Sequence, residues 1–353
     1  MVLKKLRKKI DSIDSNITRL LNLRAEITTD ISRLKQKNGA SVYSPDRERE
    51  VLRRLALINK GPLSPAALEA IYREIMSSSL SLGKPIKIAY LGPEASFSHL
   101  AALKRFGSQV EYVPCNSIAE AFLEVERDTA DYAVVPIENS IEGAVSHTLD
   151  MFVESDLKIC SQIILDVAHN LLGNCPKNKI KLVYSNPQVF GQCRIWLQEN
   201  LPWAEHIEVS STTRAAQIAA REKYSACIAS LLAAKIYKLK VLACDIEDSP
   251  HNITRFLVIG KTSAGQTGND KTSILFSIKD KVGALHNMLL PFKKYRLNLT
   301  KIESRPSKKR AWDYYFFVDL QGHSDNPKVK RALDELDKKC KFLKILGSYP
   351  VGE

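Results

Sequence analysis

Two positively charged residues lie on the apolar face of a long N-terminal helical pattern. Leucine and isoleucine recur at alternating spacings of four and three residues from Leu6 to Leu34, which is typical of a helix that packs along its whole length. Arg24 takes the place of one apolar residue, and Lys35 projects from nearly the same face eleven residues later. Because a buried cation needs an anionic partner, the spacing favours a site for a small ligand with several negative charges. The alternative is a polar residue that sets the register or the oligomeric state.

A second set of polar residues follows short apolar runs in the middle of the chain. Serine, threonine or asparagine stands at the end of each run, next to the expected start of a helix. Backbone N–H groups at helix starts attract anions, and ligands of α/β proteins bind at the carboxyl ends of strands. Each residue alone could simply cap a helix, but together they favour a binding crevice. They are Ser96, Ser98, Asn139, Ser140, Ser185, Asn186, Ser211, Thr212 and Thr213.

Three segments are expected to position these residues. Residues 1–83 contain only helical patterns: one from about residue 3 to 37, and two more that begin near Ser44 and Ser64, each followed by proline. The first helix would be roughly 50 Å long at 1.5 Å per residue. One small domain does not cover such a rod, so we expect a second protomer to do so.

The rest of the chain changes pattern twice. Residues 84–261 alternate short apolar runs with helical segments, which predicts an α/β domain with a mainly parallel sheet. Residues 261–271 are small and polar, as in a linker. Residues 272–353 follow the order strand, helix, strand, strand, helix, strand, which predicts an α+β ferredoxin-like domain.

Composition narrows the classes of function. The net charge of +13 is compatible with nucleic acid, but no zinc-finger, RNP or helix-turn-helix pattern is present, and acidic small molecules explain the charge equally well. No apolar run approaches 18 residues, so we expect no membrane partner. The seven cysteines are scattered and form no CxxC pair, which predicts reduced thiols in the cytoplasm and no metal site.

Several phrases carry a resemblance to known families. The middle segment resembles prephenate dehydratase through GPxxSFS at residues 92–98, PIENS at 136–140 and NxTRF at 252–256. The first segment is similar to the all-helical, intertwined chorismate mutases through LRxxID at 6–11 and RERE at 47–50. The last resembles an ACT domain through GAL at 283–285 and ESRP at 303–306. The resemblance implies a bifunctional chorismate mutase–prephenate dehydratase, a homodimer or higher homo-oligomer without a cofactor, whose middle domain is two-lobed and like a periplasmic binding protein.

The resemblance also implies roles in a mutase site. Arg7 matches the arginine that these mutases take from the start of the partner protomer's first helix. The periodicity agrees, because Arg7 points roughly 100° away from Arg24 around the helix, so the two would meet one ligand only across a dimer. Lys35 would face the ether oxygen of chorismate, and Glu48 would accept a hydrogen bond from the ring hydroxyl. The remaining residues implied to hold the substrate are Arg24, Arg47 and Ser79.

Two family positions differ in this chain. A glutamine that commonly shares the ether oxygen with the lysine falls at Gly83, and an aspartate common before RERE falls at Ser44. Loss of one such donor typically costs about 10²–10³ in rate. Lys84 or a water molecule would have to substitute, or the mutase would be weakened.

The implied dehydratase site is centred on the NxTRF phrase. Thr254 would lie at the leaving hydroxyl of prephenate, Arg255 would supply a cation, and Phe256 would pack beside the ring. Glu138 is the reserve candidate for the proton donor, since a sheltered carboxyl can have a raised pKa. The other residues expected to bind prephenate are Ser96, Asn139, Ser140, Ser185, Gln188, Ser211, Thr212 and Asn252.

The ACT resemblance implies feedback inhibition by phenylalanine. Gly283 would permit close backbone approach at a helix start, and the ESRP turn would face the GAL loop of a second subunit. The implied phenylalanine site comprises Gly283, Ala284, Leu285, His286, Glu303, Ser304, Arg305 and Pro306.

Two other functions fit the same sequence. In one, only the dehydratase is active and the helical segment is a dimerisation module. In the other, the chain is a non-catalytic protein that binds phenylalanine.

Overall fold

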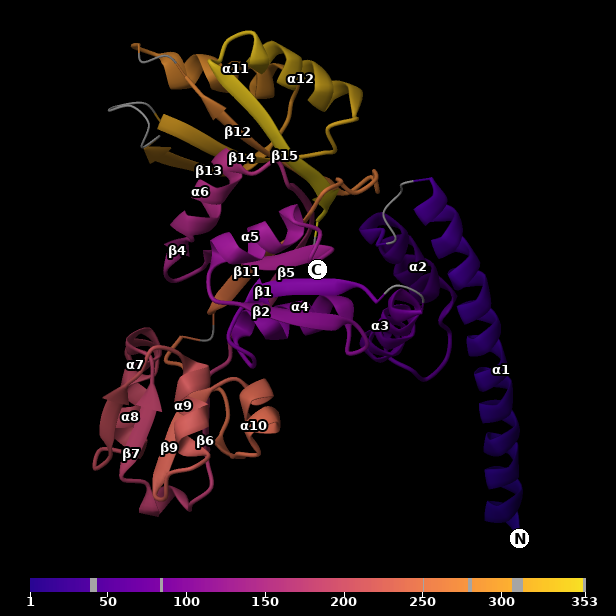
Figure 1. Cartoon of the computed structure of the whole chain (residues 1–353), viewed down its shortest axis with the longest axis vertical. Helices are drawn as coiled ribbons and strands as arrows, with labels where there is room; N and C mark the ends of the chain where they lie inside the picture. The colour runs from indigo at the N-terminus through magenta and orange to yellow at the C-terminus, as the bar shows by residue number, and fades with distance from the viewer. Residues whose placement is uncertain (39–42, 83–84, 250, 279–280, 307–313, 352–353) are drawn as a thin grey trace.

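The computed structural model describes residues 1–38, 43–82, 85–249, 251–278, 281–306 and 314–351. Three units follow one another along the chain, which we call the helical domain, the middle domain and the C-terminal domain (Figure 1). The middle domain contacts both of the others. Among the described residues, no helix is both long enough and apolar enough to cross a membrane.

The helical domain consists of α1 (Val2–Lys37), α2 (Pro45–Ile58) and α3 (Pro65–Ser81), which confirms the predicted all-helical segment. Proline occupies the first turn of α2 and α3, and the Ser64 side chain caps α3 by accepting from the Ala67 amide. The apolar residues of α1 that form the four-three pattern are exposed along the helix, for example Ile17 at 48% and Ile27 at 54%. In one chain this face therefore lacks a covering surface.

The first lobe of the middle domain is a sheet flanked by helices. Its strand order is β2-β1-β3-β11-β5, with the short β4 beside β3. The strands β1 to β3 are parallel, whereas β11 runs antiparallel to both β3 and β5. Its elements are β1 (Lys87–Leu91), α4 (Phe97–Phe106), β2 (Glu111–Cys115), α5 (Ile118–Glu126), β3 (Tyr132–Asn139), β4 (Gly143–Ala144), α6 (Ser146–Glu154), β5 (Lys158–Asp166) and β11 (Ile253–Gly260).

The second lobe contains a separate sheet in the order β10-β6-β9-β7-β8. This sheet is also mixed, since β6 is antiparallel to β9 and β10 while β7 is parallel to β8 and β9. Its elements are β6 (Asn170–Gly173), the 3₁₀ helix η1 (Lys177–Lys179), β7 (Leu182–Ser185), α7 (Pro187–Gln192), α8 (Arg194–Asn200), β8 (Glu205–Glu208), α9 (Thr212–Ala219), β9 (Ser225–Ala229), α10 (Leu231–Tyr237) and β10 (Lys240–Ala243).

The two lobes confirm the predicted fold class but differ from the expectation of a mainly parallel sheet. The chain enters the second lobe after β5 and returns as β11, which lies between β3 and β5 in the first sheet. A returning strand of this kind has no helical crossover to make it parallel to its neighbours. The returning strand carries the NxTRF phrase, so the fold places this phrase where the two lobes join (Figure 1).

The C-terminal domain confirms the predicted ferredoxin-like order. Its four strands form the sheet β13-β14-β12-β15, with α11 and α12 on one face. Strand β15 lies close to β5 of the middle domain, because a Cβ atom on Gly347 would collide with the Ile159 carbonyl oxygen. The elements are β12 (Asp270–Ser277), α11 (Ala284–Lys294), β13 (Leu299–Pro306), β14 (Tyr314–Gln321), α12 (Pro327–Asp337) and β15 (Phe342–Pro350).

Candidate active sites and the C-terminal cavity

Two cation–hydroxyl contacts mark the candidate site of the helical domain. The Arg24 Nη1 atom donates to Ser79 Oγ at 2.7 Å, which joins α1 to α3. The Lys35 Nζ atom donates to Ser44 Oγ at 2.6 Å, at the start of α2. Burial lowers the pKa of Lys35, although Asp46 partly opposes this effect. Three helices therefore bring polar groups together around the two cations of the α1 seam.

Arg7 is far from these contacts within one chain. It precedes Arg24 by seventeen residues on the same helix, which corresponds to about 26 Å at 1.5 Å per residue. A single ligand of small size cannot contact both residues of one α1. The participation of Arg7 therefore requires a second chain.

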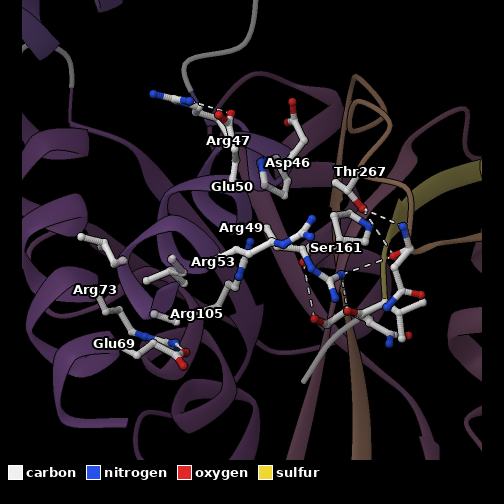
Figure 2. Close-up of a pocket in the computed structure, with 18 of the residues that line it drawn as sticks. Asp46, Arg47, Arg49, Glu50, Arg53, Glu69, Arg73, Arg105, Ser161 and Thr267 are labelled. Atoms are coloured by element: carbon white, nitrogen blue, oxygen red, sulfur yellow. Dashed lines mark hydrogen bonds and ion pairs between the residues drawn. The ribbon is translucent and has the colours of Figure 1, made fainter. Parts of the chain in front are cut away.

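The consecutive residues Arg47 and Glu48 have partners other than the residues of the Arg24 and Lys35 contacts. Arg47 pairs with Glu50 at 2.6 Å, with 55% of its side chain exposed (Figure 2). Glu48 is only 15% exposed and pairs at 3.1 Å with Arg105, which belongs to α4 of the middle domain. Burial raises the pKa of Glu48, and Arg105 and Arg73 partly counteract it. The structure thus gives Glu48 an interdomain partner, which differs from its expected position at a substrate hydroxyl.

A cleft of about 970 Å³ lies at this junction between α2, α3, α4 and β5 (Figure 2). Most of the arginines that line it already have partners. Arg49 donates to the Val351 carbonyl oxygen at 2.5 Å, and Arg73 pairs with Glu69. Arg24, Lys35 and Ser79 do not line this cleft. We therefore interpret it as a domain junction distinct from the candidate site of the helical domain. Gly83, expected at the far wall of that site, and Lys84 lie outside the described residues.

The candidate site of the middle domain is centred on Thr254 and Asn139, where β3 ends and β11 begins. The Asn139 Nδ2 atom donates to Thr254 Oγ1 and to Asn252 Oδ1, each at 2.8 Å. The Asn139 Oδ1 atom accepts from two backbone amides, which fixes the orientation of the side-chain amide. Thr254 Oγ1 is therefore an acceptor toward Asn139. Its own hydrogen finds no acceptor among the described residues and is available for a ligand.

The same network continues into the second lobe. The Asn252 Nδ2 atom donates to Gln192 Oε1 at 2.9 Å, and the same oxygen lies 2.7 Å from His169 Nε2. Since Gln192 Oε1 can only accept, His169 carries its hydrogen on Nε2. Burial lowers the pKa of His169, although the hydrogen bond to Gln192 and the charge of Glu247 partly oppose this effect. Gln192 and His169 are not among the residues predicted from the sequence. No motif or periodicity distinguishes them from their neighbours in the chain.

Several predicted binding residues fulfil local structural roles. Ser96, Asn186 and Ser211 each accept from a backbone amide two or three positions into the following helix, as N-caps do. Ser185 is fully buried and donates to the Ile228 carbonyl oxygen at 3.0 Å. Ser140 donates to the His251 carbonyl oxygen, which ties β3 to the segment before β11. Of the other predicted residues, Thr212 is buried, Gln188 is exposed, and Phe256 packs in the core around α4.

Arg255 and Glu138 contact the C-terminal domain. Arg255 Nη1 lies 2.6 Å from Asp319 Oδ2 on β14, and Nη2 donates to the Tyr349 hydroxyl oxygen on β15 at 2.9 Å. The Glu138 carboxylate lies 2.9 Å from Lys301 Nζ on β13 and 3.7 Å from Arg255 Nη1. These partners differ from the expected roles of a substrate-binding cation and a proton donor. The physical reason is the alternation of side chains along β11, which turns Arg255 to the opposite side of the strand from Thr254.

A cavity of about 330 Å³ in the C-terminal domain is lined by residues of the GAL phrase. Gly283 caps α11 with a φ of 75°, a conformation that glycine adopts at little cost. Lys281, Tyr314 and Phe316 also line the cavity. The predicted residues Gly283, Ala284, Leu285 and His286 are thus brought together around one space.

The ESRP phrase lies elsewhere, on the edge strand β13. Arg305 donates to Ser146 Oγ at 2.7 Å and pairs with Asp150 at 3.2 Å, both on α6 of the same chain. Within one chain, Glu303, Ser304 and Pro306 do not line the cavity of the GAL phrase. Their contact with the GAL loop of a second subunit stays a prediction.

The fold and the sites define a class of three-domain protein. It has a helical domain with two cations on one helix, a two-lobed α/β domain and a ferredoxin-like C-terminal domain. Comparison with known proteins agrees with this class. Residues 6–84 match the family model of chorismate mutase type II, residues 88–264 that of prephenate dehydratase, and residues 272–338 that of the ACT domain.

Whole-length relatives show the family. A bifunctional chorismate mutase/prephenate dehydratase of Aquifex aeolicus is 51% identical over 353 residues, which cover 99% of this chain and 98% of the relative. One of Pseudomonas aeruginosa is 44% identical, covering 99% and 97%. The crystal structure of prephenate dehydratase from Arthrobacter aurescens in complex with L-Phe covers 75% of this chain and 90% of that chain, with 32% identity and a TM-score of 0.70. The chain belongs to the bifunctional chorismate mutase/prephenate dehydratase family.

Proposed function

We propose that this chain rearranges chorismate to prephenate in residues 1–83 and converts prephenate to phenylpyruvate in residues 84–261. Residues 272–353 regulate the second reaction. The observation that carries the proposal is the contact between Asn139 and the Thr254 hydroxyl. Because the Thr254 oxygen accepts from the Asn139 amide, the hydrogen of the Thr254 hydroxyl can be donated to a ligand. The sites lie in separate domains, so each reaction can be removed without the other.

The mutase reaction requires orientation and electrostatics, with no acid, base or cofactor. One carbon–oxygen bond breaks while a carbon–carbon bond forms within the same molecule. A protein accelerates this step by holding the dicarboxylate in a compact conformer and by aiming donors at the ether oxygen. Arg24, fixed by Ser79, can hold a carboxylate by paired hydrogen bonds. Lys35 is the donor for the ether oxygen, and Arg7 of a second chain completes the site.

The dehydratase reaction removes water and carbon dioxide together. The electron pair of the bond to the ring carboxylate moves into the ring as carbon dioxide leaves, and the ring hydroxyl leaves as water with one proton that comes from the solvent. In the proposed site the Thr254 O–H donates a hydrogen bond to that leaving oxygen, which stabilises the charge that develops on it. The amides of Asn139 and Asn252 keep Thr254 in position.

The C-terminal domain supplies the proposed feedback control. The cavity formed by the GAL phrase has a glycine at a helix start for close backbone approach, with Tyr314 and Phe316 as apolar walls. These features suit an amino acid with an aromatic side chain. The relative from Arthrobacter aurescens was crystallised with L-Phe, which supports phenylalanine as the ligand.

We also propose that the chain works as a homodimer in the cytoplasm. The exposed apolar face of α1 needs a cover, and a second α1 offers a matching face while it brings Arg7 to Arg24. All seven cysteines are free thiols, as expected in a reducing compartment.

Substitution of Ile17 by Asp is expected to dissociate the homodimer and to abolish mutase turnover. A carboxylate in the middle of the shared apolar face would be buried without a partner. Sedimentation velocity measures the change in mass. The matched control is Ser15→Asp, which places the same charge on the opposite side of α1. A dimer that persists in Ile17→Asp, with mutase turnover intact, would contradict the shared-helix site.

The purified chain tests the proposed function directly with prephenate as substrate. We expect phenylpyruvate to form and phenylalanine to inhibit its formation. The binding-protein alternative instead predicts that phenylalanine binds while prephenate persists at the background rate. If prephenate is consumed but chorismate is not, the helical domain is a dimerisation module.

A further inference from the structure

The residue beside Thr254 on β11 points into the interface with the C-terminal domain. Arg255 is 8% exposed, and two oxygen atoms of that domain contact its guanidinium group. One belongs to Asp319 at 2.6 Å and the other to Tyr349 at 2.9 Å. Both terminal nitrogens of the guanidinium group are thus held by the C-terminal domain, while its buried Nε atom has no hydrogen-bond partner among the described residues.

The partners of Arg255 are themselves held by three strands of the C-terminal domain. Asp319 on β14 accepts from Ser273 Oγ on β12, and Ser273 lies 2.6 Å from the Tyr349 hydroxyl on β15. Ser273, Asp319 and Tyr349 are all buried. This closed network fixes the position of Asp319 and, through it, the position of Arg255.

The strand pairing brings this interface next to the proposed reaction site. Arg255 pairs in register with Glu138, and Thr254 pairs with Asn139 one position along. Glu138 contacts Lys301 of the C-terminal domain at 2.9 Å. Arg255 and Glu138, which pair across the two strands, thus both contact the C-terminal domain. The neighbouring pair, Thr254 and Asn139, forms the proposed reaction site.

The same strand of the C-terminal domain also reaches the cavity of the GAL phrase. Phe316 on β14 lines that cavity, and Asp319 follows it three residues later on β14. A ligand in the cavity and the Arg255 guanidinium therefore contact one rigid strand.

We propose that Arg255 is a positioning residue: its contact with Asp319 ties Thr254 to the C-terminal domain, so that phenylalanine in the cavity acts on dehydration through this contact. The inference rests on the proposed function. It replaces the expected substrate-binding cation with a mechanical link between domains. Such regulation requires a contact that differs between the state with phenylalanine in the cavity and the state without it. We propose that the Arg255–Asp319 pair is this contact.

The test is an Asp319→Asn variant of the full chain. It keeps the shape of the side chain and removes the charge that holds Arg255. We expect kcat for prephenate to fall about tenfold, KM to change less than twofold, and inhibition by phenylalanine to be lost while phenylalanine still binds in calorimetry. Chorismate turnover in the same sample shows that the chain is folded. Asp334→Asn on the exposed face of α12 is the matched control and should behave as the wild type.

A second variant keeps the inference testable if Asp319→Asn does not fold. Tyr349→Phe removes only the hydroxyl that accepts from Arg255, and we expect it to reduce kcat and inhibition in the same direction. Wild-type kcat and inhibition in the variants would overturn the inference, as would a large rise in KM for prephenate, which would indicate a substrate-binding role. A wild-type chain without prephenate turnover would overturn the proposed function itself, and the inference with it.

Discussion

Replacement of Thr254 by Val lowers kcat for prephenate dehydration by about 10²–10³ in our account, the range expected for loss of one positioned hydrogen-bond donor to developing charge. Valine has the shape of threonine without the hydroxyl, so the packing of β11 is preserved. It leaves Asn139 without its acceptor on Thr254 and removes the hydrogen that faces the leaving oxygen. The measurement is the rate of phenylpyruvate formation at saturating prephenate.

The matched control for this variant is Thr129→Val. Thr129 is an exposed threonine whose hydroxyl, among the described residues, bonds to the Glu124 carbonyl oxygen; it precedes β3, whose opposite end carries Asn139. It should retain wild-type turnover of both substrates. Thr254→Val with a kcat within twofold of the wild type would show that Thr254 does not act on the leaving group.

Replacement of Arg24 by Ala is expected to lower kcat/KM for chorismate by about 10²–10³, the cost of removing one donor from an electrostatic site. Truncation also leaves Ser79, which is buried, without the donor of its 2.7 Å contact. Prephenate turnover should be unchanged, because no residue of α1 lies in the middle domain. Both rates are measured on the same preparation.

Arg33→Ala provides a control on the same helix. Arg33 is 72% exposed and, in the part of the chain that the structure describes, pairs with Asp30 one turn earlier. Chorismate turnover that survives in Arg24→Ala would identify the helical domain as a dimerisation module. Equal loss of turnover in Arg33→Ala would show that the effect is not specific to the Arg24 site.

The fold could be predicted from the sequence where local chemistry decides it. Helices α2 and α3 begin at the predicted prolines, and α11 begins after Gly283, since caps and proline act within one turn. The strand order in each sheet depends on long-range pairing. The antiparallel position of β11 therefore could not be read from its apolar run.

For the candidate sites, residues that meet within one domain could be predicted from the sequence, whereas contacts between domains could not. The motifs singled out Thr254 and Asn139, which the structure brings into contact. The apolar periodicity singled out Arg24, and the resemblance implied Ser79, which the structure also brings into contact. The partners of Arg255 depend on which side of β11 faces the C-terminal domain. That orientation is set by the docking of two domains, for which no local pattern exists.

Interdomain contacts account for most of the differences from the predicted roles. Glu48 pairs with Arg105 of the middle domain, and Arg305 pairs with Asp150 of α6. Glu48 belongs to the RERE phrase and Arg305 to the ESRP phrase, and the family resemblance implies that both phrases bind a ligand. Charged residues near domain boundaries have several possible partners, and the sequence alone does not choose between them.

The most direct test of two reactions at two separate sites is to trace products from chorismate in the wild type, Arg24→Ala and Thr254→Val. We expect the wild type to convert chorismate to phenylpyruvate. Thr254→Val should accumulate prephenate, and Arg24→Ala should leave chorismate unchanged while it still converts added prephenate. Loss of both reactions in either variant, or no conversion by the wild type, would contradict the account.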